Sequence, residues 1–263
     1  MKFFALKIAY NGARFSGFAP QRTDGIASVS ECLGQALARL GIDSPIIGAG
    51  RTDKGVHALG MVVRICLADE QAAHWDSARL YSLLSPKLSA DIFLRAVWEV
   101  DSSFHPRFSA TARRYMYIFT PHTPLPFHAS FVSKELIGDT TLLRECLRLC
   151  IGEHDFALFC KSGSNPKSTI RTIDSAHLLI RHYPAQPSVY AKPYYIVRLS
   201  GNAFLRSQVR LLLGAALAVS RGVISLADFS SQLQAKSRSY SIPVSAQGLY
   251  LDKVWYPQLS AIY

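Results

Sequence analysis

The chain has few acidic residues, few cysteines and no long hydrophobic run. Its longest apolar stretch in a late helical pattern, residues 211–219, is far shorter than the roughly 20 residues that span a bilayer. The five cysteines are odd in number, include no C-x-x-C pair and follow no secretory leader. Buried thiols explain them better than a disulfide framework. These absences predict a cytoplasmic protein without a membrane segment.

Groups that bind a metal or a cofactor are also scarce. Cys146 and Cys150 are four residues apart and share a predicted helix face, yet no nearby His or Cys pair completes a zinc site. The sequence contains no motif for a cofactor. We therefore expect neither a metal nor a cofactor.

Basic residues are abundant. There are 29 Lys and Arg against 18 Asp and Glu among 263 residues, which gives a formal net charge of +11. Such a charge indicates an anionic partner, and nucleic acid is the commonest one. The length fits one large domain or two smaller ones.

The most informative segment is residues 48–58, which read G-A-G-R-T-D-K-G-V-H-A. Its glycines let the backbone turn sharply after the apolar pair Ile46 and Ile47. Asp53 therefore follows a predicted strand on a loop, close to Arg51, and a neighbouring cation favours an ionised carboxylate. This arrangement suits a nucleophile. It also suits an Asx-turn with a solvated arginine, which is the commoner use of Asp among glycines, so the residues alone leave both interpretations open.

The segment nevertheless resembles a known active site. Residues 51–58 are similar to the motif G-R-T-D-A-G-V-H of the TruA-type tRNA pseudouridine synthases, with Lys54 in place of the usual alanine. Four further blocks resemble the same family in the expected order: residues 104–117 (F-H-P-R-F-S-A-T-A-R-R-Y-M-Y), 152–156, 202–210 and 248–251. Near the start, Asn11 and Phe18 stand where the family has Asp and Trp. The resemblance covers nearly the whole chain.

Hydrophobic periodicity predicts an α/β chain of the α+β kind. Strands are expected at 3–10, 45–49, 60–67, 92–100, 114–120, 172–181, 194–200 and 250–255, and helices at 28–40, 76–88, 140–151, 204–221 and 225–234. The β-α-β-β-α-β order of the first half is typical of a ferredoxin-like or RRM-like unit, and the second half resembles it in pattern. We expect domains at 1–107 and 108–263. The resemblance implies two such domains with antiparallel sheets, a shared central cleft and a homodimer.

The family motif assigns the catalytic roles. Asp53 is the expected nucleophile, and Tyr115 is expected to stack on the uracil and assist proton removal from C5. Tyr115 could instead be a core aromatic of its strand, and only the motif selects it over Tyr117. A shielded Asp53 needs a cation, for which the resemblance selects Arg210. Arg206 and Arg210 are expected on one face of the helix at 204–221, although two surface arginines would fit the same pattern.

Further residues are expected to contact RNA. Arg51 either holds Asp53 or enters the RNA in place of a flipped uridine, and the resemblance favours the second role. The expected substrate-binding residues are Arg51, Phe104, His105, Pro106, Arg107, Phe108, Tyr115, Gly163, Ser164, Asn165, Pro166, Lys167 and Arg206. Cations on such loops suit phosphate contacts. His57 is expected to fix the loop.

These features predict an isomerase that converts uridines 38 to 40 of the tRNA anticodon stem-loop to pseudouridine. The same chemistry on another RNA is one alternative, and a non-catalytic RNA-binding module is the other. A metal-dependent nuclease fits poorly, because Asp53 has no acidic neighbour in its motif.

Overall fold

Strands and helices alternate along the chain in two successive groups. The computed structural model describes residues 1–20, 25–68, 72–182 and 193–262. Contacts divide the chain into one unit of Met1–Thr111 with Tyr250–Tyr263 and a second unit of Ala112–Leu249. The domain boundary at residue 107 stays a prediction.

The first unit has the strand and helix order that the sequence predicts. Its elements are β1 (Lys2–Tyr10), α1 (Val29–Ala38), β2 (Ile47–Gly48), β3 (His57–Leu67), α3 (Ser77–Leu84) and β4 (Ile92–Val100). Short 3-10 helices lie at η1 (Gly12–Arg14) and η2 (Ser85–Lys87). The β-α-β-β-α-β prediction is confirmed for this half of the chain.

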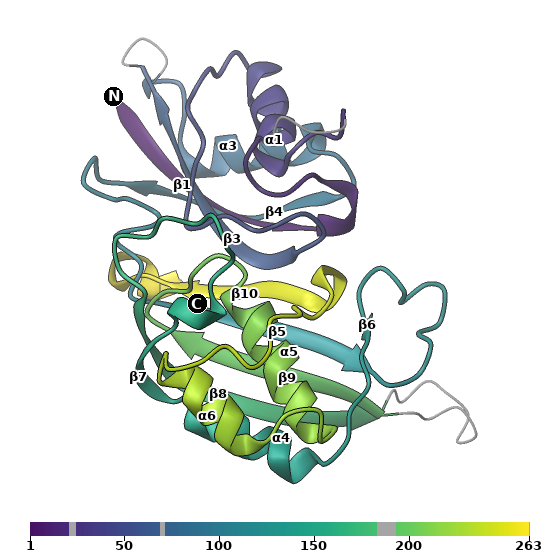
Figure 1. Cartoon of the computed structure of the whole chain (residues 1–263). Helices are drawn as coiled ribbons and strands as arrows, with labels where there is room; N and C mark the ends of the chain where they lie inside the picture. Colours follow the sequence, from purple (N-terminus) through teal and green to yellow (C-terminus); the bar gives the residue numbers. More distant parts are fainter. Residues whose placement is uncertain (21–24, 69–71, 183–192, 263) are drawn as a thin grey trace. The chain divides into compact units, whose positions relative to one another are not determined.

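The strands of the first unit are hydrogen-bonded side by side. β1 lies between β4 and β3 and is antiparallel to both, while β2 pairs with β3. β10 (Leu249–Trp255) joins the other edge of β3 in a parallel register that sets Tyr250 against His57. α1 and α3 lie along the sheet (Figure 1), where the buried side chains of Phe4, Leu6 and Ile8 contribute to the core.

The helix α1 begins where the sequence predicts. The side chain of Ser28 accepts a hydrogen bond from the backbone of Glu31, and Glu31 in turn accepts one from the backbone of Ser28. This reciprocal capping box satisfies two backbone donors that a helix start leaves open.

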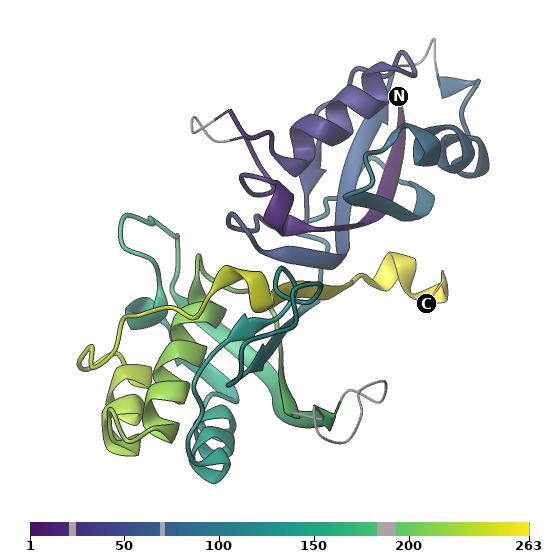
Figure 2. The same cartoon turned by 90° about the vertical axis from the view of Figure 1, so that its right-hand side faces the viewer.

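In the second unit, four strands pair antiparallel in the order β5-β9-β8-β7. Its elements are β5 (Ala112–Thr120), β6 (Ser133–Lys134), α4 (Thr140–Leu149), β7 (Gly152–Asp155), η3 (Ala157–Phe159), β8 (Ile170–His182), β9 (Pro193–Gly201), α5 (Gln208–Ser220), α6 (Leu226–Leu233) and η5 (Ala246–Gly248). The chain ends with η6 (Pro257–Ile262). Figure 2 shows the helices of this unit gathered on one side of its strands.

The prediction of a helix from residue 204 is wrong at its start. α5 begins only at Gln208, because Ser207 has a φ of 59°, in the left-handed region that breaks helical geometry. The side-chain carbonyl of Gln208 accepts the N–H of Leu205 at 2.7 Å, which satisfies that donor outside a helix. Residues 204–207 are therefore a separate segment that leads into α5.

Candidate active site

Asp53 lies on a tight turn between β2 and β3 and is half-buried. The preceding residue, Thr52, is buried. The Thr52 hydroxyl lies 2.8 Å from the hydroxyl of Tyr10, and the Thr52 carbonyl accepts the N–H of Phe18 at 3.2 Å. After Asp53, the N–H of Val56 donates to the Asp53 carbonyl at 3.1 Å. The backbone is therefore bound on both sides of Asp53, which restricts the positions that its carboxylate can reach.

Two cations belong to the same turn. Arg51 and Lys54 are both exposed, one on each side of the Thr52–Asp53 pair. Both side chains are accessible to an anionic ligand that approaches Asp53.

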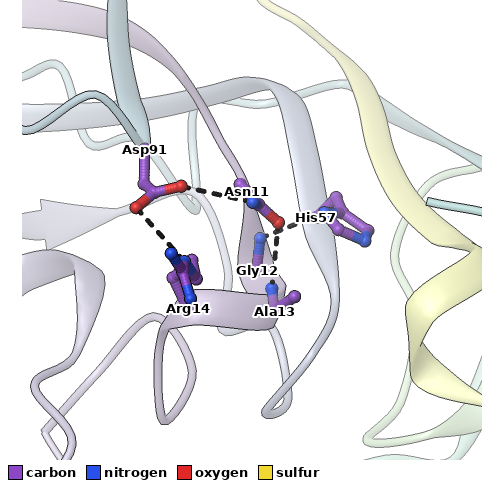
Figure 3. A network of polar contacts seen from close by, with 6 residues as sticks. All are labelled: Asn11, Gly12, Ala13, Arg14, His57 and Asp91. Carbon is purple, nitrogen blue, oxygen red and sulfur yellow. Dashed lines mark hydrogen bonds and ion pairs between the residues drawn. The ribbon is translucent and has the colours of Figure 1, made fainter. Parts of the chain in front are cut away.

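His57, at the start of β3, connects this turn to the segment after β1. Its side chain is 1% exposed, and its Nδ1 accepts the N–H of Gly12 at 3.1 Å (Figure 3). This contact agrees with the loop-fixing role expected from the sequence.

The segment of Phe104 to Phe108 is held by groups from elsewhere in the first unit. Arg64 on β3 donates to the carbonyl of Phe104 at 2.7 Å, and the hydroxyl of Tyr256 donates to the carbonyl of Pro106 at 2.7 Å. Phe104 is buried against Tyr256, with ring centroids 5.2 Å apart. Phe104 and Pro106 therefore anchor the segment through buried contacts.

The end of that segment is open. Phe108 is 77% exposed; its ring centroid lies 4.4 Å from that of His105 and 5.7 Å from the guanidinium of Arg107. The Nδ1 of His105 accepts the N–H groups of Arg107 and Phe108. Burial lowers the pKa of His105, and Arg64 and Arg107 lower it further. The His105 ring is therefore an acceptor that orders the backbone of two exposed residues.

A group of cations on three strands of the first unit was not predicted from the sequence. Lys7 on β1 lies near Arg95 on β4 and near Lys253 and Asp252 on β10. Burial, together with the charges of Arg95 and Lys253, lowers the pKa of Lys7 to about 8. Positive charge is thus concentrated on this sheet, and no single sequence window contains the residues that supply it.

In the second unit, Tyr115 and Tyr117 have different surroundings. Tyr117 is buried, and its hydroxyl donates to Glu135 at 2.8 Å; burial and the nearby carboxylate raise its pKa. Tyr115 is half-buried, and its ring meets Phe204 edge-on with centroids 5.1 Å apart. Tyr117 is thus committed to a buried contact, and Tyr115 is the more accessible of the two.

Arg206 and Arg210 do not share a helix face, and the expectation that they do is wrong. Arg206 precedes α5 and is exposed, whereas Arg210 lies in the first turn of α5 and is half-buried. The Nε of Arg210 donates to the carbonyl of Val244 at 2.8 Å, and the N–H of Val244 donates back to the Arg210 carbonyl at 3.1 Å. The charge of Arg210 also acts on Tyr117. The guanidinium is therefore held near β5 in a defined orientation.

The loop that contains Gly163, Ser164, Asn165, Pro166 and Lys167 lies beside Arg206. The N–H of Lys161 donates to the Arg206 carbonyl at 3.1 Å, and the N–H of Ser164 donates to the Lys161 carbonyl at 3.2 Å. Of the loop residues, Gly163, Asn165 and Lys167 are exposed, and Ser164 and Pro166 are half-buried. The structure thus brings this loop together with the segment that contains Arg206.

No cluster of three or more His, Cys, Asp or Glu side chains among the described residues could hold a metal ion. Within the same residues, no helix combines the length and apolar character needed to cross a membrane. The five cysteine thiols are free.

Comparison with known proteins identifies the family. A family model described as tRNA pseudouridine synthase matches residues 147–257. The chain is 45% identical to tRNA pseudouridine synthase A of Helicobacter hepaticus over 252 residues, which is 95% of this chain and 97% of that protein. The chain belongs to the tRNA pseudouridine synthase A family. It is also 36% identical over 256 residues to the enzyme of that name from Helicobacter pylori, and 35% identical over 259 residues to the one from Helicobacter acinonychis; each alignment covers 97% of this chain and all of the relative.

Membership of the tRNA pseudouridine synthase A family agrees with the architecture. Mostly antiparallel strand pairing, with helices in both units, confirms the predicted α+β fold. The residues matched by the family model run from the end of α4 through β10, and they include the segment before α5 and Arg210 itself.

Proposed function

We propose that the chain converts uridines 38 to 40 of the tRNA anticodon stem-loop to pseudouridine, with Asp53 as the reacting carboxylate. Membership of the family carries the coarser part of this proposal, an isomerase that acts on tRNA. The observation that supports the role of Asp53 is the bound backbone of its turn, which holds the half-buried Asp53 close in sequence to two exposed cations.

The reaction needs few chemical groups. The C1′–N1 bond of the uridine breaks, the base turns, and a C1′–C5 bond forms; the proton on C5 is then removed and N1 gains one. Nothing is oxidised or reduced. Asp53 either attacks the substrate or assists loss of the base from the ribose, and both routes use an ionised carboxylate.

Tyr115 and Arg210 complete the proposed catalytic set. The ring of Tyr115, held against Phe204, offers a surface for the uracil, and its hydroxyl serves the removal of the C5 proton. Arg210 supplies the cation for Asp53, with a guanidinium already oriented by the Val244 carbonyl. The burial of the Tyr117 hydroxyl against Glu135 supports the choice of Tyr115.

The proposed RNA contacts are electrostatic and aromatic. Exposed Arg51 enters the RNA as the target uridine leaves the stack, which costs a few kcal/mol of unstacking energy. Arg107, Lys167 and Arg206 contact phosphates, which fix register but read no sequence. The segment of residues 104–108 and the loop of residues 163–167 thus recognise shape, as several neighbouring uridines require. We also propose that the protein acts as a cytoplasmic homodimer, as the family resemblance implies.

Mapping of pseudouridine on unmodified tRNA tests the substrate. Transcripts with uridine at 38, 39 and 40 are incubated with the protein, treated with carbodiimide and read by primer extension. We expect stops at these three positions in the wild-type reaction and none with Asp53→Ala. Stops elsewhere in the tRNA would overturn the assignment of position.

The alternative with the same chemistry, another RNA as the main target, is tested in the same way. Total RNA is exposed to the protein, and pseudouridine is mapped across all species. A preference for an RNA other than tRNA would favour this alternative over the anticodon stem-loop.

A further inference from the structure

We propose that His57 is a positioning residue, which holds the Asp53 turn in its reactive shape through a hydrogen-bond acceptor on its imidazole ring. The inference rests on the proposed role of Asp53. It concerns how the first unit presents that carboxylate, and it requires no change in the reaction itself.

The ring of His57 is fixed on two sides. Its Nδ1 accepts the N–H of Gly12 at 3.1 Å (Figure 3), and its face stacks on Tyr250 with centroids 4.7 Å apart and an interplanar angle of 21°. The side chain is 1% exposed, so water cannot replace the Gly12 contact. A buried N–H without an acceptor is costly, and the bond therefore binds η1 to the start of β3.

Gly12 allows the two segments to meet backbone to backbone. A Cβ at position 12 would lie 2.0 Å from the carbonyl oxygen of Val56, which is far inside contact distance. η1 thus packs directly on the last residue of the Asp53 turn. The side chain of Asn11 accepts the N–H of Ala13 and so supports η1 at this place.

The backbone of the turn couples the position of His57 to that of Asp53. Val56 precedes His57, and its N–H donates to the Asp53 carbonyl at 3.1 Å. Between them Gly55 takes a φ of 82°, which closes the turn. A shift of Val56 away from η1 therefore displaces Asp53, and small displacements of a reacting group are costly for catalysis.

The contact also specifies the state of the ring. Nδ1 accepts a hydrogen bond, so it carries no proton, and the neutral ring has its N–H at Nε2. His57 therefore serves as a fixed acceptor at Nδ1.

Three substitutions at position 57 separate this role from packing. His57→Asn keeps an oxygen acceptor where Nδ1 lies but loses most of the ring. His57→Phe keeps the ring against Tyr250 but removes the acceptor. His57→Gln carries its amide beyond the Nδ1 position and serves as a second variant without a matched acceptor.

Single-turnover rates of pseudouridine formation and tRNA affinity are measured for each variant at saturating enzyme. We expect His57→Phe and His57→Gln to lose about 10- to 100-fold in rate with little change in tRNA affinity, whereas His57→Asn recovers most of the rate. A packing role predicts the reverse order, with Phe the most active. If His57→Phe does not fold, the comparison of Gln with Asn decides alone.

Two results would overturn the inference: a wild-type rate in His57→Gln, or equal losses in the Asn and Gln variants. Asp53→Asn in the same assay tests the proposed role of Asp53 separately from that of His57. An inert Asp53→Asn with no difference within the His57 series refutes only the role of His57. An active Asp53→Asn refutes the proposed role of Asp53, on which the role of His57 rests.

Discussion

Asn11 forms hydrogen bonds through both the nitrogen and the oxygen of its side-chain amide, at a position where the family segment has aspartate. Its Nδ2 donates to Asp91 at 3.2 Å, and its Oδ1 accepts the N–H of Ala13 at 3.3 Å (Figure 3). Asp91 also lies 3.8 Å from the Nε of Arg14. An aspartate at position 11 could still accept from Ala13, but it would face a second carboxylate. The departure from the family motif is therefore matched by the residue at position 91.

This pairing predicts a stability effect that a partner change reverses. Asn11→Asp replaces a donor by a charge next to Asp91 and should lower the free energy of unfolding by about 1–2 kcal/mol. Asn11→Asp combined with Asp91→Asn restores a donor and acceptor, and should recover most of the loss. Urea unfolding at pH 7 measures all four proteins of the cycle. Additive effects in the double variant, with no recovery, would contradict the proposed coupling.

At the scale of elements, long periodic patterns determine what can be predicted from the sequence. The strand predicted at 92–100 coincides with β4, because its burial alternates along most of its length. β6 and β7 were not predicted: they have two and four residues, too few for a periodic pattern, and they exist through pairing with β5 and β8. The start of α5 was missed because it depends on one residue, Ser207, in an unusual backbone conformation.

Gly34, in the middle of α1, tests how the space around a glycine determines the effect of replacing it. Its missing Cβ would meet only the Cδ1 of Ile46 at 3.6 Å, an ordinary contact, so no fold requirement keeps glycine there. Gly34→Ala should raise the free energy of unfolding by about 1 kcal/mol, because alanine is the better helix former.

Gly12→Ala is the matched opposite, since the same added methyl would lie 2.0 Å from the Val56 carbonyl oxygen. It should destabilise the protein strongly. Thermal and urea unfolding of both variants check the pair. A destabilised Gly34→Ala would contradict the open space beside that position in α1, and a neutral Gly12→Ala would contradict the close approach of η1 to the Asp53 turn.

At the scale of the whole molecule, the basic composition indicated an anionic partner, and the ordered blocks indicated the family. The blocks also gave the candidate residues Asp53, Tyr115 and Arg210, which composition and periodicity could not single out. What holds those residues was beyond prediction, because the contacts join distant positions: His57 to Gly12, and Arg210 to Val244. Such pairs depend on how strands and turns pack.

The central claim is that Asp53 carries the chemistry, and release of tritium from tRNA labelled at C5 of its uridines tests it most directly. Tritium leaves C5 only when the new C1′–C5 bond has formed and the proton is removed. Wild-type protein should release tritium, and Asp53→Asn should bind the same tRNA with similar affinity and release none. Tritium release by Asp53→Asn at a rate near that of the wild type would contradict the account.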